Sequence, residues 1–241
     1  MEIGTITWTD NDLINELGAF SEILKNKPIE NNIGGMLAPH LFYTWFYMNT
    51  VKPKFVIESG VFKGQGTWAM DVGNPDMTFY CFDPTINSTE YKIKNAKYFV
   101  YDLTQFNWKS IDTNFIENSI VFLDDHVCDY DRIVFLRKFG FKKYIVEDNY
   151  PPGVGDQLSI KKILEGEEEY NEQRNKILSF IKVYYEFPPI FSSRLTRWGN
   201  PWNTYSVKNP LLDASYHTKE NYKIYSDEYY DYTYFGYVEV D

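Results

Sequence analysis

Five short apolar runs between residues 54 and 148 constrain the fold of this chain more than any other feature. Each is four to six apolar or β-prone residues long and closes on an acidic side chain. This pattern is typical of strands that are buried on both faces of a parallel sheet. The runs are Lys54–Ser59, Thr78–Asp83, Lys97–Asp102, Ser119–Asp125 and Lys142–Asp148. They predict an α/β fold with a doubly wound, mostly parallel sheet, whose carboxyl edge collects the acids at a ligand site.

The segments around these runs favour helices and one further strand. Thr9 is a candidate cap for an amphipathic helix that stops near Pro28, and a long charged helix is expected from Glu167 to Tyr185. The remaining predicted elements are helices at His40–Asn49, Gly64–Val72 and Asp129–Phe139 and a terminal strand at Tyr232–Val240. We therefore expect residues 1–52 to form an N-terminal helical cap or lid on an α/β domain of residues 53–241, in one compact unit.

Composition narrows the class of partner. The 34 acidic residues outnumber the 24 basic ones, giving a net charge of −10, which argues against a nucleic-acid partner because such binding needs a dense basic field. The sequence has neither a run of about 20 apolar residues nor a secretion signal, so we expect a cytoplasmic protein without a membrane partner. Cys81 and Cys128 lie in apolar runs and are expected to be reduced. Aromatic residues make up 19% of the chain; this favours sugars and other polar planar ligands, or reflects only an AT-rich coding bias.

A glycine-rich motif, Ile57–Thr67, follows the first predicted strand and precedes a helix. Gly60, Gly64 and Gly66 allow a sharp turn and close approach of the backbone to a ligand. The spacing differs from the G-x-G-x-x-G fingerprint of dinucleotide sites. Glu58 beside the turn suits a cationic ammonium group better than a diphosphate. The alternative is a glycine-rich turn without a ligand.

Two acids end the next two predicted strands. Asp83 stands at about the distance from the glycine motif at which an acid accepts the hydroxyls of a ribose. Asp102 is placed to reach an adenine amino group, although an aspartate at this position also caps helices.

Two denser acid clusters end the fourth and fifth predicted strands. Asp124, Asp125 and His126 are contiguous, and Glu147 and Asp148 follow the neighbouring strand. Adjacent strand ends lie about 5 Å apart, so these carboxylates converge and need a cation, for which oxygen ligands favour Mg²⁺ or Ca²⁺. His126 is a candidate proton acceptor. The alternative is that some of these acids face solvent and the others cap helices.

Two loops are candidates for contact with a substrate. A turn-rich segment, Tyr150–Asp156, follows the fifth strand, and Arg194–Trp202 combines arginine, proline and tryptophan. Ordinary loop packing explains both equally well.

These motifs together resemble the class I S-adenosylmethionine-dependent methyltransferases, over roughly Pro53–Asp156. Glu58 and Gly60 are similar to the first motif of that family, and Asp83 to its ribose-binding acid. The acid clusters resemble the branch of macrocin-type sugar O-methyltransferases and cephalosporin hydroxylase-like proteins. In that branch the corresponding acids hold Mg²⁺, which grips vicinal hydroxyls of the acceptor. That branch usually has a residue between the first aspartate and the Asp-His pair, whereas here they are contiguous, so either Asp124 or Asp125 is the first ligand.

The resemblance implies a Rossmann-like fold and an O-methyltransferase that uses S-adenosylmethionine and Mg²⁺ to modify a sugar, a glycan or another small vicinal diol. It implies metal binding by Asp124, Glu147 and Asp148 and proton removal by His126 or Asp125. The implied cofactor contacts are Glu58, Gly60, Gly64, Gln65, Thr67, Asp83, Asp102 and Asp124. A phenolic or catechol diol also offers hydroxyls that such a metal would hold. A homo-oligomer is compatible with the sequence. The alternatives are a metal-dependent nucleotide-sugar glycosyltransferase and a methyltransferase-like protein that binds without turnover.

Overall fold

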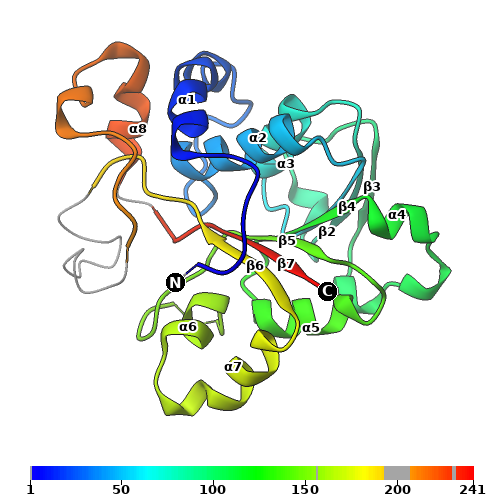
Figure 1. Cartoon of the computed structure of the whole chain (residues 1–241). Coiled ribbons are helices and arrows are strands. Elements are labelled where there is room, and N and C mark those ends of the chain that lie inside the picture. Colours follow the sequence, from blue (N-terminus) through cyan, green and yellow to red (C-terminus); the bar gives the residue numbers. More distant parts are fainter. Residues whose placement is uncertain (1, 156, 193–206, 230–231) are drawn as a thin grey trace.

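A single twisted sheet runs through the molecule in the computed structural model, which describes residues 2–155, 157–192, 207–229 and 232–241 (Figure 1). Its strand order is β3-β2-β1-β4-β5-β7-β6, and β7 is antiparallel to both of its neighbours while the other pairs are parallel. The strands are β1 (Phe55–Ser59), β2 (Thr78–Phe82), β3 (Ala96–Phe99), β4 (Ser119–Leu123), β5 (Lys143–Val146), β6 (Ile181–Glu186) and β7 (Gly236–Val240). The sheet confirms the predicted doubly wound, Rossmann-like α/β class.

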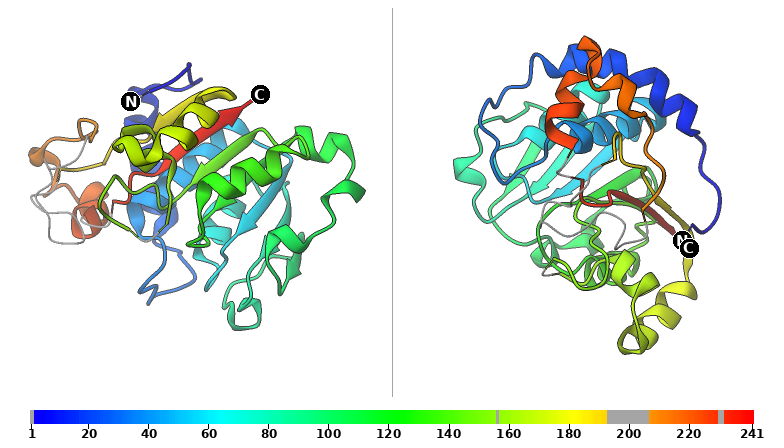
Figure 2. Two further views of the ribbon diagram at one scale, coloured as in Figure 1. Left: turned by 90° about the horizontal axis from the view of Figure 1, so that it is seen from below. Right: turned by 90° about the vertical axis from the view of Figure 1, so that its left-hand side faces the viewer.

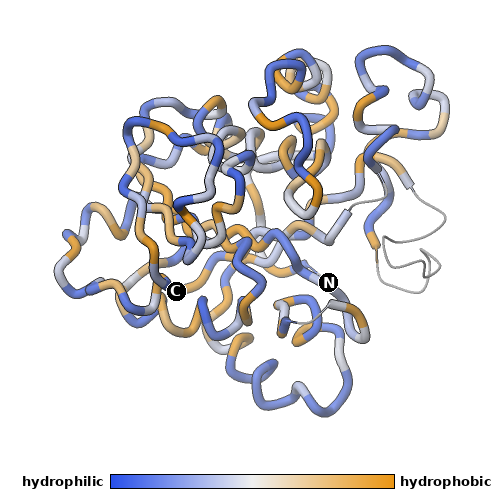
Figure 3. Tube along the Cα trace, turned by 180° about the vertical axis from the view of Figure 1, so that it is seen from behind, coloured by the Kyte–Doolittle hydropathy of each residue, from blue (hydrophilic) through white to orange (hydrophobic). Residues whose placement is uncertain are grey.

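Helices cover both faces of the sheet (Figures 1 and 2). Side chains alternate along each strand, so that Val56 packs into the core under one helical layer and Ile57 into the core under the other. The first layer contains α1 (Asp10–Leu24), α2 (Ala38–Val51), α3 (Gln65–Gly73) and α8 (Lys223–Glu228). The second contains α4 (Thr113–Glu117), α5 (Asp129–Arg137), α6 (Ile160–Glu165) and α7 (Asn171–Leu178). The chain around α7 consists mainly of hydrophilic residues, at the bottom of Figure 3.

The N-terminal helices form where the sequence predicts them. Thr9 caps α1 in a capping box with Asp12, each side chain accepting from the backbone of the other residue. Helix α2 packs closely on α3 at Gly73, where a Cβ atom would lie 2.9 Å from the Cβ of Met48. The predicted cap therefore packs against one face of the sheet, and the loop between α1 and α2 reaches the carboxyl edge.

The prediction of one long helix from Glu167 to Tyr185 is wrong. The segment instead forms a 3-10 turn at 168–170 and then α7, which ends at Leu178. The chain then enters β6. Along β6, which pairs with β7, the side chain of Lys182 is exposed. The side chains of Val183, Tyr184 and Tyr185 are buried in the cores on the two faces of the sheet. Tertiary pairing with β7 therefore overrides the local helical pattern of this charged segment.

The direction of winding reverses between β1 and β4, which are adjacent in the sheet although β2 and β3 lie between them in sequence. Ser59 at the end of β1 lies opposite Leu123 at the end of β4. Loops that leave the sheet on either side of such a reversal open a crevice at its carboxyl edge. No helix in the described part of the chain is both long and apolar enough to cross a membrane.

Candidate active site

A cavity of about 430 Å³ opens at this reversal point. Its volume lies in the range that takes a small-molecule ligand or cofactor. The lining residues come from the loop before α2, from the ends of β1, β2, β3 and β4, and from α5. They are Gly34, Gly35, Ser59, Gly60, Phe62, Phe82, Asp83, Pro84, Tyr101, Asp102, Asp124, Asp125, His126, Val127 and Arg132. The predicted edge is therefore the edge that carries the cavity.

The glycine turn joins β1 to α3 and fixes one wall of the cavity. Gly60 has a φ of +87°, and a Cβ atom at this position would overlap the backbone carbonyl of Asp124. The amide of Asp124 donates to the carbonyl of Ser59 at 2.8 Å, so the ends of β1 and β4 are in direct backbone contact. Gly64 precedes α3 with a φ of +96°, which is the second point in the turn that requires a glycine.

Asp83 lines the cavity and also holds the glycine turn. Its Oδ2 accepts from the amides of Val61 and Phe62 at 2.9 and 2.8 Å, and its Oδ1 accepts from the amide and hydroxyl of Thr85. Burial acts to raise the pKa of Asp83, but these hydrogen bonds outweigh it and lower the pKa. The carboxylate is therefore ionised at the cavity wall, with its acceptor sites occupied by four donors.

Glu58 points away from the cavity, behind the glycine turn. Its carboxylate accepts from the hydroxyl of Thr67 at 2.8 Å and contacts the thiol of Cys81 at 3.3 Å. Burial raises the pKa of Glu58 to about 7. Gln65 also lies outside the cavity lining, with its Oε1 accepting from the amide of Ile29 at 3.2 Å.

Arg132 of α5 neutralises the acids on the β3 side of the cavity. Its guanidinium binds Asp102 through both terminal nitrogens, at 2.8 and 2.5 Å, and contacts Asp125 Oδ2 at 2.9 Å. Asp102 also caps the turn at Thr104, which is the alternative that the sequence left open. Hydrogen bonds from Arg132 hold the pKa of Asp102 well below its usual range. Asp125 further accepts from the hydroxyl of Ser59 at 2.5 Å, so this carboxylate is already engaged.

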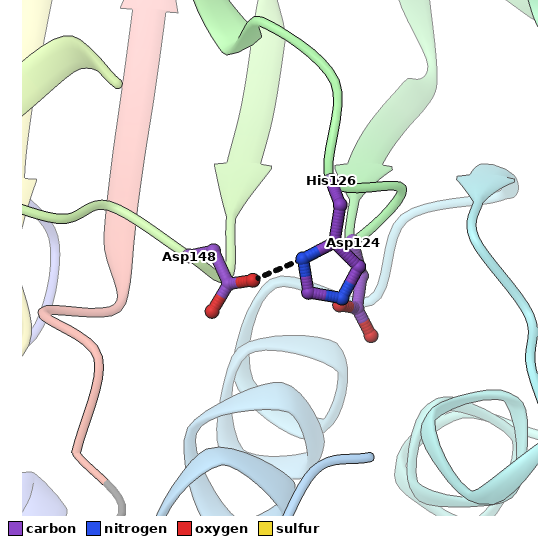
Figure 4. A group of neighbouring side chains, drawn as sticks. All are labelled: Asp124, His126 and Asp148. Carbon is purple, nitrogen blue, oxygen red and sulfur yellow. Dashed lines mark ion pairs between the residues drawn. The ribbon is translucent and has the colours of Figure 1, made fainter. Parts of the chain in front are cut away.

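The β5 side of the edge brings three potential metal ligands together. Asp124, His126 and Asp148 each offer an atom within 4.8 Å of the other two (Figure 4). His126 Nδ1 lies 3.0 Å from Asp148 Oδ2, and Tyr150 donates to Asp148 Oδ1 at 2.5 Å. His126 has a φ of +53°, which is uncommon for a residue with a side chain and is typical of functional sites. Of the two aspartates between which the sequence left the choice, Asp124 is therefore the one in this cluster.

Glu147 lies beside this cluster but is engaged from behind. Its Oε1 is 2.5 Å from Nδ1 of His40, a buried residue of α2. The carbonyl of Glu147 accepts from the hydroxyl of Thr233 at 2.6 Å. No local pattern predicts either partner, because both are distant from Glu147 along the chain.

The electrostatics of the two acid groups differ. Burial raises the pKa of Asp124 well above its usual value, and the nearby carboxylates of Glu147 and Asp148 raise it further. Burial also disfavours ionised Asp148, but hydrogen bonds from His126, Glu147 and Tyr150 lower the pKa of Asp148 to about 2. No lysine or arginine among the described residues forms an ion pair with Asp124 or Asp148. Neutralisation on this side therefore falls to shared protons or to a cation.

The loop before α2 contributes Gly34 and Gly35 to the cavity. It is fixed at its base, where Lys63 donates to the carbonyl of Asn31 at 2.6 Å. In the predicted substrate loop after β5, Tyr150 is buried and contacts Asp148, whereas the second predicted loop, Arg194–Trp202, lies outside the described residues.

Comparison with known proteins gives similarity in solved structures only. No protein-family profile matches the chain, and no curated protein matches it in sequence. Similar solved structures include the S-adenosylhomocysteine-bound methyltransferase PaMTH1 of Podospora anserina, with 12% identity over 77% of this chain and 95% of the other, at a TM-score of 0.46. The O-methyltransferase TomG of Streptomyces achromogenes, in complex with S-adenosylmethionine, has 11% identity over 75% and 85% of the two chains, at a TM-score of 0.47. A methyltransferase from Geobacter sulfurreducens has 12% identity over 59% and 73%, at 0.37.

Proposed function

We propose that this chain is an S-adenosylmethionine-dependent O-methyltransferase that uses a divalent cation to hold its acceptor. The observation that carries the proposal is the cavity at the reversal point of the sheet. Among the described residues, four aspartates line it, and Arg132 is bound to two of them. Such a cavity favours a ligand that carries positive charge, as the sulfonium and ammonium groups of the cofactor do.

The cofactor half of the site is assigned to the glycine turn and to Asp83. The turn allows close approach at Gly60, and Asp83, directly after β2, accepts from the amides of Val61 and Phe62 in this turn. For Asp83 to accept a ribose hydroxyl, the side chain of Thr85 must give up one of its hydrogen bonds. Glu58, Gln65 and Thr67 support the turn from behind rather than from the cavity wall.

The metal half is assigned to Asp124 and Asp148, with Glu147 as a further ligand. The residues fit a hard cation because their carboxylate oxygens converge and neither aspartate is paired with a lysine or arginine of the described residues. When bound, the cation orients two hydroxyls of the acceptor and lowers the pKa of the attacking one. Asp124 and Asp148 then fix the position of that hydroxyl relative to the cofactor.

Proton removal is assigned to His126 in preference to Asp125. The side chain of His126 lines the cavity and is 58% exposed, so it can pass a proton on to water. Asp125 already accepts from Ser59 and Arg132. This engagement opposes its use as a base.

The acidic lining argues against the glycosyltransferase alternative. A nucleotide diphosphate would bring negative charge to a wall that contains Asp83, Asp102 and Asp124, with the guanidinium of Arg132 already occupied. For the acceptor we favour a sugar or glycan diol, on the resemblance of the acid clusters and on the aromatic content of 19%. A catechol remains the competing diol.

The cofactor assignment is tested by calorimetric titration of the full chain with S-adenosylhomocysteine, with Mg²⁺ and with a chelator. We expect micromolar binding that Asp83→Asn weakens at least tenfold. The matched control is Asp112→Asn. Like Asp83, Asp112 accepts from the backbone amide two residues further along the chain, but it lies outside the cavity lining. No binding in either metal state would overturn the proposal.

The reaction is tested by following a labelled methyl group from S-adenosylmethionine to a panel of sugars with vicinal hydroxyls and to catechols. Transfer that Mg²⁺ supports and a chelator abolishes is the expected result. Full transfer in the chelator would remove the metal from the proposal while leaving the methyltransferase intact.

A further inference from the structure

A histidine outside the acid clusters is bound at both of its ring nitrogens. His40 lies in α2 and is 1% exposed, and its Nδ1 is 2.5 Å from Glu147 Oε1. On the other edge of the ring, Nε2 lies 3.1 Å from the backbone amide of Thr233. The ring also stacks on Phe235, with an angle of 24° between the planes. The imidazole is therefore held on both edges and on one face.

These contacts decide which nitrogen of His40 carries the proton. A backbone amide only donates, so Nε2 must be the unprotonated nitrogen that accepts from Thr233. The neutral ring then carries its proton on Nδ1, the nitrogen that lies 2.5 Å from Glu147 Oε1. The hydroxyl of Thr233 closes the arrangement by donating to the carbonyl of Glu147 at 2.6 Å. That bond holds only the backbone of Glu147, whereas His40 contacts its carboxylate.

The engaged oxygen leaves the rest of the Glu147 carboxylate on the side of the acid cluster. The carboxyl group of Glu147 lies close enough to Asp148 and Asp124 to shift the pKa of both. A metal-binding side chain is generally oriented by such a second hydrogen bond, and losing that partner typically costs 10- to 100-fold in metal affinity.

We infer that His40 is a positioning residue of the cation site, which donates from Nδ1 to Glu147 and so presents that carboxylate beside Asp148. The inference deepens the proposed function and rests on it, because it assigns Glu147 to the cation. It also makes α2 a part of the site rather than only a cover for the sheet. His40 itself does not face the cavity lining.

Two substitutions of His40 test the Nδ1 donor separately from the packing of the ring. His40→Asn keeps an amide donor near the place of Nδ1, whereas His40→Gln reaches Thr233 and loses the donor to Glu147. Both remove the stacking on Phe235, so they are matched for lost packing. Thr233→Val is the control, because it keeps the backbone amide that binds Nε2 and removes only the hydroxyl.

The test is the affinity of the full chain for Mn²⁺, measured from the free-ion signal in electron paramagnetic resonance, with the affinity for S-adenosylhomocysteine measured beside it. We expect His40→Gln to weaken Mn²⁺ binding about 10- to 100-fold. His40→Asn and Thr233→Val should stay within about threefold of the wild type, and S-adenosylhomocysteine binding should not change in any of them. Equal Mn²⁺ affinity in the Asn and Gln variants, whether kept or lost, would overturn the inference.

A measurement on the unaltered protein covers the case in which a variant does not fold. The chain has three histidines, and nitrogen NMR distinguishes the two neutral forms of each ring. His40 must show a protonated Nδ1 and an unprotonated Nε2; the opposite form would overturn the inference. If the wild type binds S-adenosylhomocysteine but no Mn²⁺, the metal assignment fails together with the inference, whereas a wild type that binds both leaves only the role of His40 to the variants.

Discussion

The two sides of the carboxyl edge deal with negative charge in opposite ways. On the β3 side, Asp102 and Asp125 share the guanidinium of Arg132, and Asp83 is satisfied by backbone amides and Thr85. On the β5 side, Asp124 and Asp148 face other acids and an exposed histidine. Clustered acids at a sheet edge are therefore not one kind of site: Asp102 and Asp125 have a built-in cation, whereas Asp124 and Asp148 have no lysine or arginine partner among the described residues.

Removing a carboxylate on the β5 side should have the largest effect. Asp148→Asn keeps the shape of the side chain but removes the charge that a cation needs. We expect kcat/KM for methyl transfer to fall on the order of 1,000-fold, about 4 kcal/mol in transition-state stabilisation. The measurement is transfer of labelled methyl at saturating Mg²⁺.

The same variant should keep its affinity for S-adenosylhomocysteine, because Asp148 is absent from the cavity lining. Asp125→Asn is the matched control on the other side of the edge. Equal losses of transfer in the two variants would erase the difference between the sides.

Removing the built-in cation should reduce stability rather than chemistry. Arg132→Met leaves Asp102 and Asp125 without their partner, and Arg132 is only 5% exposed. Breaking a buried ion pair on one side costs about 3 kcal/mol or more in the free energy of unfolding. Urea denaturation at neutral pH measures the loss.

The pH at which that loss is measured matters. The pKa of Asp102 is depressed in the folded chain, so its contribution to stability is present above its unfolded pKa of about 3.9 and disappears as the pH falls below that value. The Arg132→Met variant should therefore converge on the wild type in acid. A difference that is unchanged at low pH would contradict the ion-pair account.

Glu58 is a third kind of acid, one without either a fixed cation or access to a ligand. Burial raises its pKa to about 7, so the folded chain keeps the proton where the unfolded chain releases it. Wild-type stability should accordingly fall as the pH rises from 5 to 7. Between pH 5 and pH 7, the free energy of unfolding of Glu58→Gln should rise by about 2 kcal/mol relative to that of the wild type.

Urea unfolding at the two pH values checks this gain. Cys81→Ala, which removes the contacting thiol but leaves the carboxyl group, serves as a control that must still show the pH-dependent fall. If the free energy of unfolding changes between the two pH values by the same amount in Glu58→Gln as in the wild type, the carboxylate is ionised in the folded state.

The smallest effect is expected at the exposed end of the β3 side. The side chain of Asp102 is 34% exposed, so solvent screens its bond to Arg132. Asp102→Asn should cost less than about 1 kcal/mol in the free energy of unfolding, since Arg132 still has Asp125. A cost as large as that of Arg132→Met would place the whole stabilising effect in Asp102.

The sequence predicted the sheet edge well and the partners of its acids poorly. The five parallel strands lie within the predicted runs or one residue outside them, because continuous apolar runs have few alternatives in a fold of this size. The glycine turn could also be read, since Gly60 and Gly64 both adopt the positive φ that such a motif serves. Strand β6 was missed because its pairing with β7 has no local signal.

The division of the acids into two groups lies beyond any local pattern. Asp124 and Asp125 are neighbours in sequence, yet one joins the cluster of His126 and the other turns to Arg132. That choice depends on α5, which brings Arg132 to the β3 side. His40 reaches Glu147 only because α2 packs against the same sheet, so neither partner follows from spacing.

On the proposed function, a divalent cation binds on the β5 side of this edge and nowhere else along it. The most direct test is anomalous X-ray diffraction from crystals of the protein soaked in Mn²⁺. The account predicts a single anomalous peak among the side-chain atoms of Asp124 and Asp148. A peak beside Asp102 and Asp125, or none at the edge when S-adenosylhomocysteine is bound, would contradict it.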